Sequence, residues 1–166
     1  MPSRFLVSVL VQFSLVACSV GLPRGPNTAT VQEGGIEYRL ETARSSYDVG
    51  EVVALVYSIT NTTHEDFQPG MVPNCEYCTQ QFHATRDSQE VWRTCRVIPP
   101  CGWAEFILSP GATREWTEEW ALTNDNGTLE PEDDFPLDPG TYTITAELYL
   151  SATASRMPIS LQLQIK

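Results

Sequence analysis

Strict alternation of apolar and polar residues is the feature that most constrains the fold of this chain. The last ten residues, MPISLQLQIK, show it most clearly. Ile159, Leu161, Leu163 and Ile165 share one face, and Ser160, Gln162 and Gln164 share the other. Successive side chains of a β-strand point to opposite faces of its sheet, so this pattern predicts a strand with one buried face.

The same alternation recurs along the chain, and no segment has a sustained helical period. The predicted strands are IEYRLET, the apolar central strand GEVVALVYSITNTT, a hairpin of QQFHATRD and EVWRT around the polar turn RDSQ, TREWTEEWALT, and GTYTITAELYL. A sheet with one apolar face must bury that face against another sheet. The sequence therefore predicts an all-β fold, an Ig-like antiparallel β-sandwich of about seven strands.

The turn DPGTYTI has two interpretations. It resembles the approach to a tyrosine corner, in which the hydroxyl of Tyr142 would bond to nearby backbone. Alternatively, Tyr142 is an ordinary aromatic residue of the core.

The N-terminus resembles a bacterial lipoprotein signal. Arg4 precedes an apolar run that is too short to span a bilayer comfortably, and the run ends in the lipobox-like LVAC, with Cys18 at the position that is lipidated. An ordinary signal peptide cleaved near Ala17 is the alternative. We expect residues 1–17 to be a lipoprotein signal peptide, 18–35 a lipidated, flexible tether, and 36–166 one β-sandwich domain.

The formal net charge of −11 bears on partners. An acidic chain repels phosphate backbones and anionic membrane surfaces, so we expect no nucleic-acid binding, and membrane attachment only through the lipid. The predicted location is the cell envelope of a bacterium. Ser19, a residue other than Asp after the lipidated cysteine, favours sorting to the outer membrane; the sequence does not fix the leaflet.

The four remaining cysteines predict two disulfides, since disulfides persist in exported proteins. If the hairpin turn centres on Ser88, residues whose numbers add up to 176 face each other, which favours Cys75–Cys101 and Cys78–Cys95. The swapped pairing remains open. A zinc site is a weaker alternative because Cys95 and Cys101 are poorly spaced for a knuckle, and a redox site lacks the expected helix.

The order of these segments resembles the BsuPI-type intracellular proteinase inhibitor family over roughly residues 36–150. The matching positions are Asn61, Thr62, Val91, Trp92, Pro110, Gly111, Trp120, Pro139, Gly140, Tyr142 and Ala146. The resemblance implies the sandwich fold and, as an expectation, inhibition of a serine protease. CEYCTQQFHA departs from the family pattern, and the family's cytoplasmic setting differs from the export predicted here.

Catalytic residue patterns are sparse, so we expect no enzyme, no cofactor and no catalytic residue. His64 lies in a polar turn and His83 within the hairpin. No nucleophile elbow or phosphate-binding glycine loop occurs in the sequence. The acidic segment 124–134 has the wrong spacing for a twelve-residue calcium loop, so we predict no metal site, with calcium as the alternative.

The segment CRVIPPC is the candidate partner-binding loop: Arg96, Val97 and Ile98 precede Pro99 and Pro100, which stiffen the chain. A rigid loop braced by a disulfide suits a protease inhibitor, whereas a structural crossover between strands is the plainer interpretation. The predicted function is a lipid-anchored protein-binding module of the cell envelope, with a serine protease as the candidate partner. The alternative is an envelope scaffold without inhibitory activity.

Overall fold

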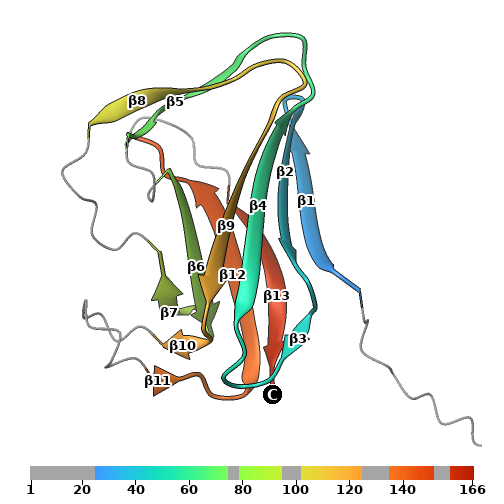
Figure 1. The fold of residues 1–166 in the computed structure, drawn as a ribbon, viewed down its shortest axis with the longest axis vertical. Coiled ribbons are helices and arrows are strands. Elements are labelled where there is room, and N and C mark those ends of the chain that lie inside the picture. The colour runs from blue at the N-terminus through green and yellow to red at the C-terminus, as the bar shows by residue number, and fades with distance from the viewer. Residues whose placement is uncertain (1–24, 75–78, 95–101, 125–134, 152–157) are drawn as a thin grey trace, which may run out of the picture.

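Two β-sheets packed face to face form the body of the protein in the computed structural model (Figure 1). The structure describes residues 25–74, 79–94, 102–124, 135–151 and 158–166, which contain no helix. The first sheet has the order β1 (Asn27–Glu33), β2 (Ile36–Thr42), β4 (Val53–Asn61), β9 (Thr113–Trp120). The second has the order β3 (Ser46–Tyr47), β13 (Ile159–Ile165), β12 (Gly140–Leu148), β6 (Gln80–Arg86), β7 (Gln89–Arg93).

The strand order confirms the predicted Ig-like sandwich. Strands β2, β4 and β9 are neighbours in one sheet, as strands A, B and E are in Ig domains, and β6, β12 and β13 are neighbours in the other, as C, F and G are. All pairs are antiparallel except β3 with β13. The central strand predicted from GEVVALVYSITNTT is β4, which pairs on both sides.

Two smaller sheets bring the strands to more than the expected seven or so. β5 (Phe67–Pro73) and β8 (Trp103–Leu108) pair as a two-stranded ribbon at one end of the sandwich, at the top of Figure 1. β10 (Thr123–Asn124) and β11 (Phe135–Pro136) form a short pair at the opposite end. The ribbon shifts register between Phe67 and Gly70, which accommodates its bend.

The core contains the residues that alternation predicted. Buried inward positions on the last two long strands are Tyr142, Ile144, Ala146, Leu148, Ile159, Leu161, Leu163 and Ile165. Trp120 and Leu122 are also buried, whereas Trp116 is only partly buried against the core. Burying these side chains contributes roughly 1.5–3 kcal/mol each relative to exposure, so the two facing sheets hold each other in place.

The first strand begins inside the range expected to be a flexible tether. β1 pairs with β2 along its full length, from Asn27 opposite Thr42 to Glu33 opposite Ile36. The connecting turn uses Gly34 and Gly35, both with positive φ (57° and 77°), which glycine adopts without strain. β1 was missed because its side chains are mostly small and exposed, and backbone pairing rather than side-chain burial holds it.

The predicted hairpin is confirmed, including its turn. Asp87 and Ser88 have φ values of 50° and 66°, as a two-residue type I′ turn requires. Next to the turn, Thr85 lies opposite Glu90; a bulge then shifts the register so that Ala84 lies opposite Trp92. Beyond the bulge the facing numbers add up to the predicted 176.

Asn61 fixes the point where the ribbon leaves the sandwich. Its side chain is fully buried, and its Nδ2 donates to the carbonyls of Glu65 (2.7 Å) and Leu108 (2.8 Å). Its Oδ1 accepts from the backbone N–H of Thr63 (3.0 Å). A buried amide bonded in this way ties the end of β4 to the end of β8.

The tyrosine corner is present. Tyr142 Oη donates to the carbonyl of Asp138 at 2.7 Å, four residues upstream. Arg86 Nη1 lies 3.3 Å from the same hydroxyl, and the Tyr142 ring is buried against Trp120. Of the two interpretations of DPGTYTI, the corner is therefore the one that the fold adopts.

Candidate functional site

The site residues predicted from the sequence lie outside the described residues. They are the lipidation candidate Cys18, the four cysteines Cys75, Cys78, Cys95 and Cys101, and the candidate loop residues Arg96, Val97, Ile98, Pro99 and Pro100. The acidic segment 125–134 also falls outside them. Lipidation, the disulfides and the contact loop therefore stay predictions, and the described residues around them define the candidate site.

The described ends of the two cysteine-bearing segments are fixed by backbone bonds. Thr94 N donates to Phe82 O (2.9 Å), and Asn74 N donates to Gly102 O (2.8 Å). The first pair continues the register of the hairpin, in which Ala84 lies opposite Trp92. The second continues the register of the ribbon, in which Pro73 lies opposite Trp103. In both registers the numbers of two facing residues add up to 176. One register thus runs through the hairpin and the ribbon on either side of these segments.

The ribbon exposes an apolar face beside those ends, and we call it the ribbon face. Trp103 and Ile107 are each 47% exposed, and both lie on the side of β8 that also carries Glu105. The Trp103 ring stacks on Tyr149, with ring centroids 6.1 Å apart. Large side chains exposed together on one strand are typical of binding surfaces.

A chain of aromatic contacts links the ribbon to the core. Phe106 of β8 lies 6.1 Å from Trp116, which stacks on Tyr57 of β4 at 5.6 Å. The Arg114 guanidinium lies over both Phe106 (5.7 Å) and Trp116 (5.6 Å). These contacts hold the ribbon in a fixed position, as a binding surface requires.

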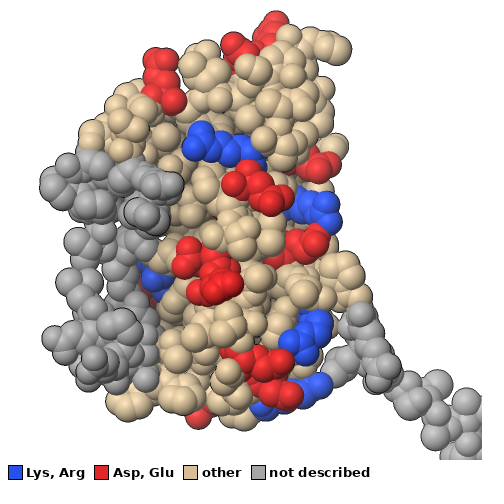
Figure 2. Space-filling view, viewed as in Figure 1, with Lys and Arg blue, Asp and Glu red and all other residues tan. Residues whose placement is uncertain are grey.

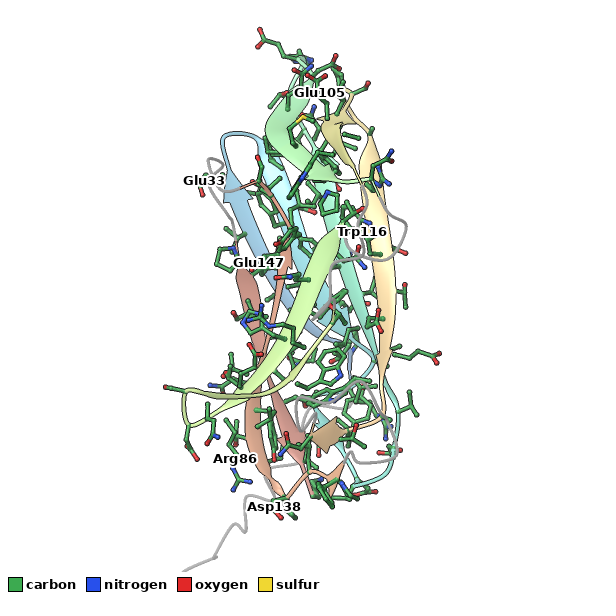
Figure 3. The ribbon with its side chains drawn as sticks, turned by 90° about the vertical axis from the view of Figure 1, so that its left-hand side faces the viewer. Glu33, Arg86, Glu105, Trp116, Asp138 and Glu147 are labelled. Atoms are coloured by element: carbon green, nitrogen blue, oxygen red, sulfur yellow. The ribbon has the colours of Figure 1, made fainter. Side chains whose placement is uncertain are left out.

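A second cluster of polar residues lies on the outer face of β6 and β12. Gln81 lies opposite Glu147, and both are at most 9% exposed. His83 lies opposite Arg93 of β7, and Arg93 donates to both carboxylate oxygens of Glu90, from Nη2 to Oε2 (2.6 Å) and from Nε to Oε1 (3.0 Å). Within the part of the chain that the structure describes, buried Gln81 Oε1 and His83 Nδ1 have no hydrogen-bond partner. In Figure 3, Glu147 lies on this outer face, on the opposite side of the view from Trp116.

The electrostatics of this cluster favour a neutral imidazole. Burial lowers the pKa of His83, the Arg93 charge lowers it further, and Glu147 and Glu90 oppose the shift. Of the residues that the structure describes, no three His, Cys, Asp or Glu side chains are grouped so that they could hold a metal ion. His64 is exposed in its turn, as the sequence predicted.

The outer face of the first sheet has a different character. Figure 2 shows acidic and basic side chains interspersed over this face. Arg39 pairs with Glu41, and Arg44 with Glu51 at 2.9 Å. Mixed exposed charges of this kind keep a surface soluble and contribute little binding energy, so the ribbon face is the stronger candidate.

The ribbon face and the polar cluster were both missed from the sequence. For the ribbon face, the sequence offered one signal: the aromatic residue Trp103 closely follows the cysteine-bearing segment. Gln81 and His83 gave no signal, because their burial depends on strands distant in sequence.

Comparison with known proteins identifies no family. No family model and no curated protein matches the chain. Among solved structures, a β-glucosidase from Listeria innocua in complex with gluconolactone is similar over 84% of this chain (14% identity, TM-score 0.40). The β-glucosidase EmGH1 from Erythrobacter marinus is similar over 85% (15% identity, TM-score 0.42).

The alkylpurine DNA glycosylase AlkC of Pseudomonas fluorescens, bound to DNA containing an abasic site analog, is similar over 75% of this chain (12% identity, TM-score 0.41). The chain spans 16% of the length of the two β-glucosidases and 28% of that of AlkC. Likeness at this level carries no argument about activity. Within the described part of the chain, no helix is long and apolar enough to cross a membrane.

Proposed function

We propose that this chain is a lipid-anchored protein of the bacterial cell envelope whose β-sandwich binds a protein partner. Cys18 is the lipidated residue of the proposal, and the contact region combines the ribbon face with the segment from Arg96 to Pro100. The exposed pair Trp103 and Ile107 is the observation that carries it. A serine protease is the candidate partner, in keeping with the resemblance to BsuPI-type inhibitors.

The position of the ribbon face supports this proposal. Trp103 follows Gly102, whose carbonyl is held by Asn74, so the exposed indole is next to one end of the candidate loop. Aromatic side chains that are anchored at one edge and exposed at the other are favoured as interface anchors. Tyr149 provides that anchor by stacking on Trp103.

The proposal includes the two disulfides. Asn74 directly precedes Cys75, and Gly102 directly follows Cys101. The hydrogen bond between Asn74 and Gly102 therefore supports a Cys75–Cys101 bridge, and Cys78–Cys95 is the second bridge of the proposal. A bridge of this kind would stabilise the protein by about 2–4 kcal/mol and brace the loop. Peptide mapping of the unreduced protein should recover both linked pairs, and recovery of the swapped pairs would reject this connectivity.

An inhibition titration tests the function. The full chain, expressed and processed in a bacterium and purified in detergent, is titrated against subtilisin-like and trypsin-like serine proteases. We expect inhibition that is lost in Ile98→Asp and weakened about tenfold or more in Trp103→Ala. Val52→Ala is the matched control, because Val52 is 54% exposed but belongs to a different part of the fold.

The second candidate is an envelope scaffold without inhibitory activity. The ribbon face supports it as well, since an exposed apolar strand can bind a partner without a loop that enters a protease cleft. Absence of inhibition, together with partner cross-linking in cells that Trp103→Ala abolishes and Val52→Ala retains, would establish it. If neither inhibition nor cross-linking is found, the binding proposal is wrong.

Membrane attachment is tested separately. Cys18→Ala in the full chain should abolish lipid labelling and move the protein from the detergent phase to the aqueous phase. Ser19→Ala, next to it, should leave both unchanged. A Cys18→Ala protein that still takes up the lipid label would contradict lipid anchoring at this residue.

A further inference from the structure

Strand β9 forms one margin of the first sheet as the described residues build it. β9 pairs with β4 from Thr113 to Trp120. In the described part of the chain, no other strand pairs with it and no backbone bond joins its outer edge to another segment. Figure 1 shows β9 at the margin of its sheet. An edge of eight residues with which no described strand pairs is a template for a further strand.

The backbone groups at the free edge can be identified. Asn61 N donates to Ala112 O (2.9 Å), so this pair is a bonded pair of the β4–β9 ladder. Bonded pairs alternate in an antiparallel ladder, so Arg114, Trp116 and Glu118 direct their N–H and C=O groups to β4. The groups directed to the free edge are those of Thr113, Glu115, Thr117 and Glu119.

The inward side of β9 carries two charges of opposite sign around one tryptophan. Arg114 precedes Trp116 by two residues, and Glu118 follows it by two. Neither charge has an ion-pair partner among the described residues, and Arg114 contacts only aromatic rings. Burial, followed by the charge of Glu119, raises the pKa of Glu118, as expected for a half-buried carboxylate without a cation.

We propose that β9 pairs antiparallel with β9 of a second copy of this chain, with Trp116 opposite its own counterpart. Arg114 then faces Glu118 of the second copy, and the same pair forms again on the other side of the twofold axis. These positions are non-bonded pairs of the new ladder, where facing side chains come closest. The free-edge groups of Thr113, Glu115, Thr117 and Glu119 supply its hydrogen bonds.

The charges select this register. In the proposed pairing Glu115 faces Thr117 and Glu119 faces Thr113, so no like charges are opposite one another. A slip of two residues in one direction places Glu115 against Glu115 of the second copy, and in the other direction against Glu119. Like charges directly opposite each other destabilise a sheet, and a slip of one residue sets inward side chains against outward ones.

Charge reversal tests the pairing. The full chain, processed in a bacterium, is examined by sedimentation equilibrium in density-matched detergent up to millimolar concentration, at a salt concentration that screens the repulsion between two acidic copies. Glu118→Arg and Arg114→Glu should each weaken dimerisation about tenfold or more, because each places like charges opposite one another. The double reversal should restore it.

Backbone substitution tests the edge itself. Thr117→Pro removes an N–H group from the free edge without removing a bond to β4, so it should abolish the dimer, whereas Thr117→Ala should retain it. Hydrogen exchange of the unmodified chain provides a measurement that needs no variant. Protection of the Glu115, Thr117 and Glu119 amides should rise with protein concentration, while the Trp116 amide is protected throughout by β4.

Several results would overturn the proposal. The first is a monomer at all concentrations, with free-edge amides that exchange equally fast throughout. A dimer that is insensitive to both single reversals would place the interface elsewhere. Single reversals that remove the dimer while the folded double reversal does not restore it would reject this register.

Discussion

The two long sides of the sandwich are built from different residues. On one side β2 faces β13, and β1 lies beside β13, with Asn27 Nδ2 donating to Gln162 O (2.6 Å). The inward side chains there, such as Leu40 and Leu163, are fully buried. We call this the sealed side.

On the other side, which we call the open side, β9 is the last strand of its sheet. Figure 3 views the molecule from the open side and labels Trp116, one of the inward residues of β9. The neighbouring inward positions are Arg114 and Glu118, while Trp120 is buried and stacks on Trp92 of β7 (5.1 Å). Inward positions thus include charged side chains on β9, whereas on β2 and β13 of the sealed side they are uncharged and buried.

The difference shows that an inward position is not the same as a buried one. A strand flanked by neighbours on both sides buries its inward side chains, so an unpaired charge does not suit such a position. A strand at the margin keeps contact with water, and charges there discourage unwanted strand pairing. The open side is therefore where selective pairing can occur, and substitutions should behave differently on the two sides.

The largest expected effect follows from placing a carboxylate on the sealed side. Leu163→Glu should destabilise the protein by about 4 kcal/mol or more, because an unpaired charge would be buried where Leu163 has no exposure. Urea unfolding followed by tryptophan fluorescence measures the loss. Leu163→Met, which conserves volume, should cost less than about 1.5 kcal/mol. A Leu163→Glu protein of near-normal stability would remove the distinction between the sides.

Alternation predicted the sealed side well, because burial there depends only on period two and on apolar side chains. Ile159 to Ile165 follow that pattern without exception, whereas on β12 the outward Thr145 and Glu147 are buried as well as the inward residues. β1 escaped prediction because its pairing with β2 is made by backbone groups, which every sequence carries. The hairpin turn was predictable from RDSQ, but the bulge beside Trp92 was not, because no residue pattern of the two strands marks it.

The open side and the candidate site were less predictable. TREWTEEW showed which residues share the inward face, but not that β9 ends its sheet, so the exposure of Glu118 could not be foreseen. The burial of Gln81 beside Glu147 likewise depends on strands far apart in the sequence. The cysteine and loop predictions concern residues outside those described and await the experiments above.

The second largest expected effect on stability comes from removing the Tyr142 hydroxyl, which has a hydrogen-bond partner. Tyr142→Phe removes the bond from the hydroxyl to Asp138 O and leaves that carbonyl without its donor. We expect a loss of about 1–1.5 kcal/mol, measured by urea unfolding. No loss of stability would show that the corner hydroxyl is replaced by water without cost.

Tyr57, in the core, differs from Tyr142 in the surroundings of its hydroxyl. Its hydroxyl is fully buried and has no hydrogen-bond partner among the described residues, and burial raises its pKa. Tyr57→Phe should therefore leave stability unchanged or raise it by up to about 1 kcal/mol, because the ring contacts with Trp116 and Phe82 remain. A loss as large as that of Tyr142→Phe would reveal a partner for this hydroxyl.

The smallest effect concerns the charge on the open side. Because the pKa of Glu118 is raised above its ordinary value of 4.5, the folded protein holds this proton to a higher pH than the unfolded chain does. Stability therefore falls as the pH rises through the window just above 4.5. Glu118→Gln lacks this fall in stability. At neutral pH and low protein concentration, its free energy of unfolding should therefore exceed that of the parent by a few tenths of a kcal/mol. The difference is small because solvent screens the group.

The pH profile separates this gain from a general effect of charge. Below about pH 4 the variant and its parent should have equal stability, since both side chains are then neutral. Glu119→Gln, on the outer face, should gain less, because it removes only the repulsion from its neighbour. At concentrations where the proposed dimer forms, Arg114 of the second copy gives Glu118 a partner, and Glu118→Gln should become destabilising. A gain that is the same at all concentrations would argue against that pairing.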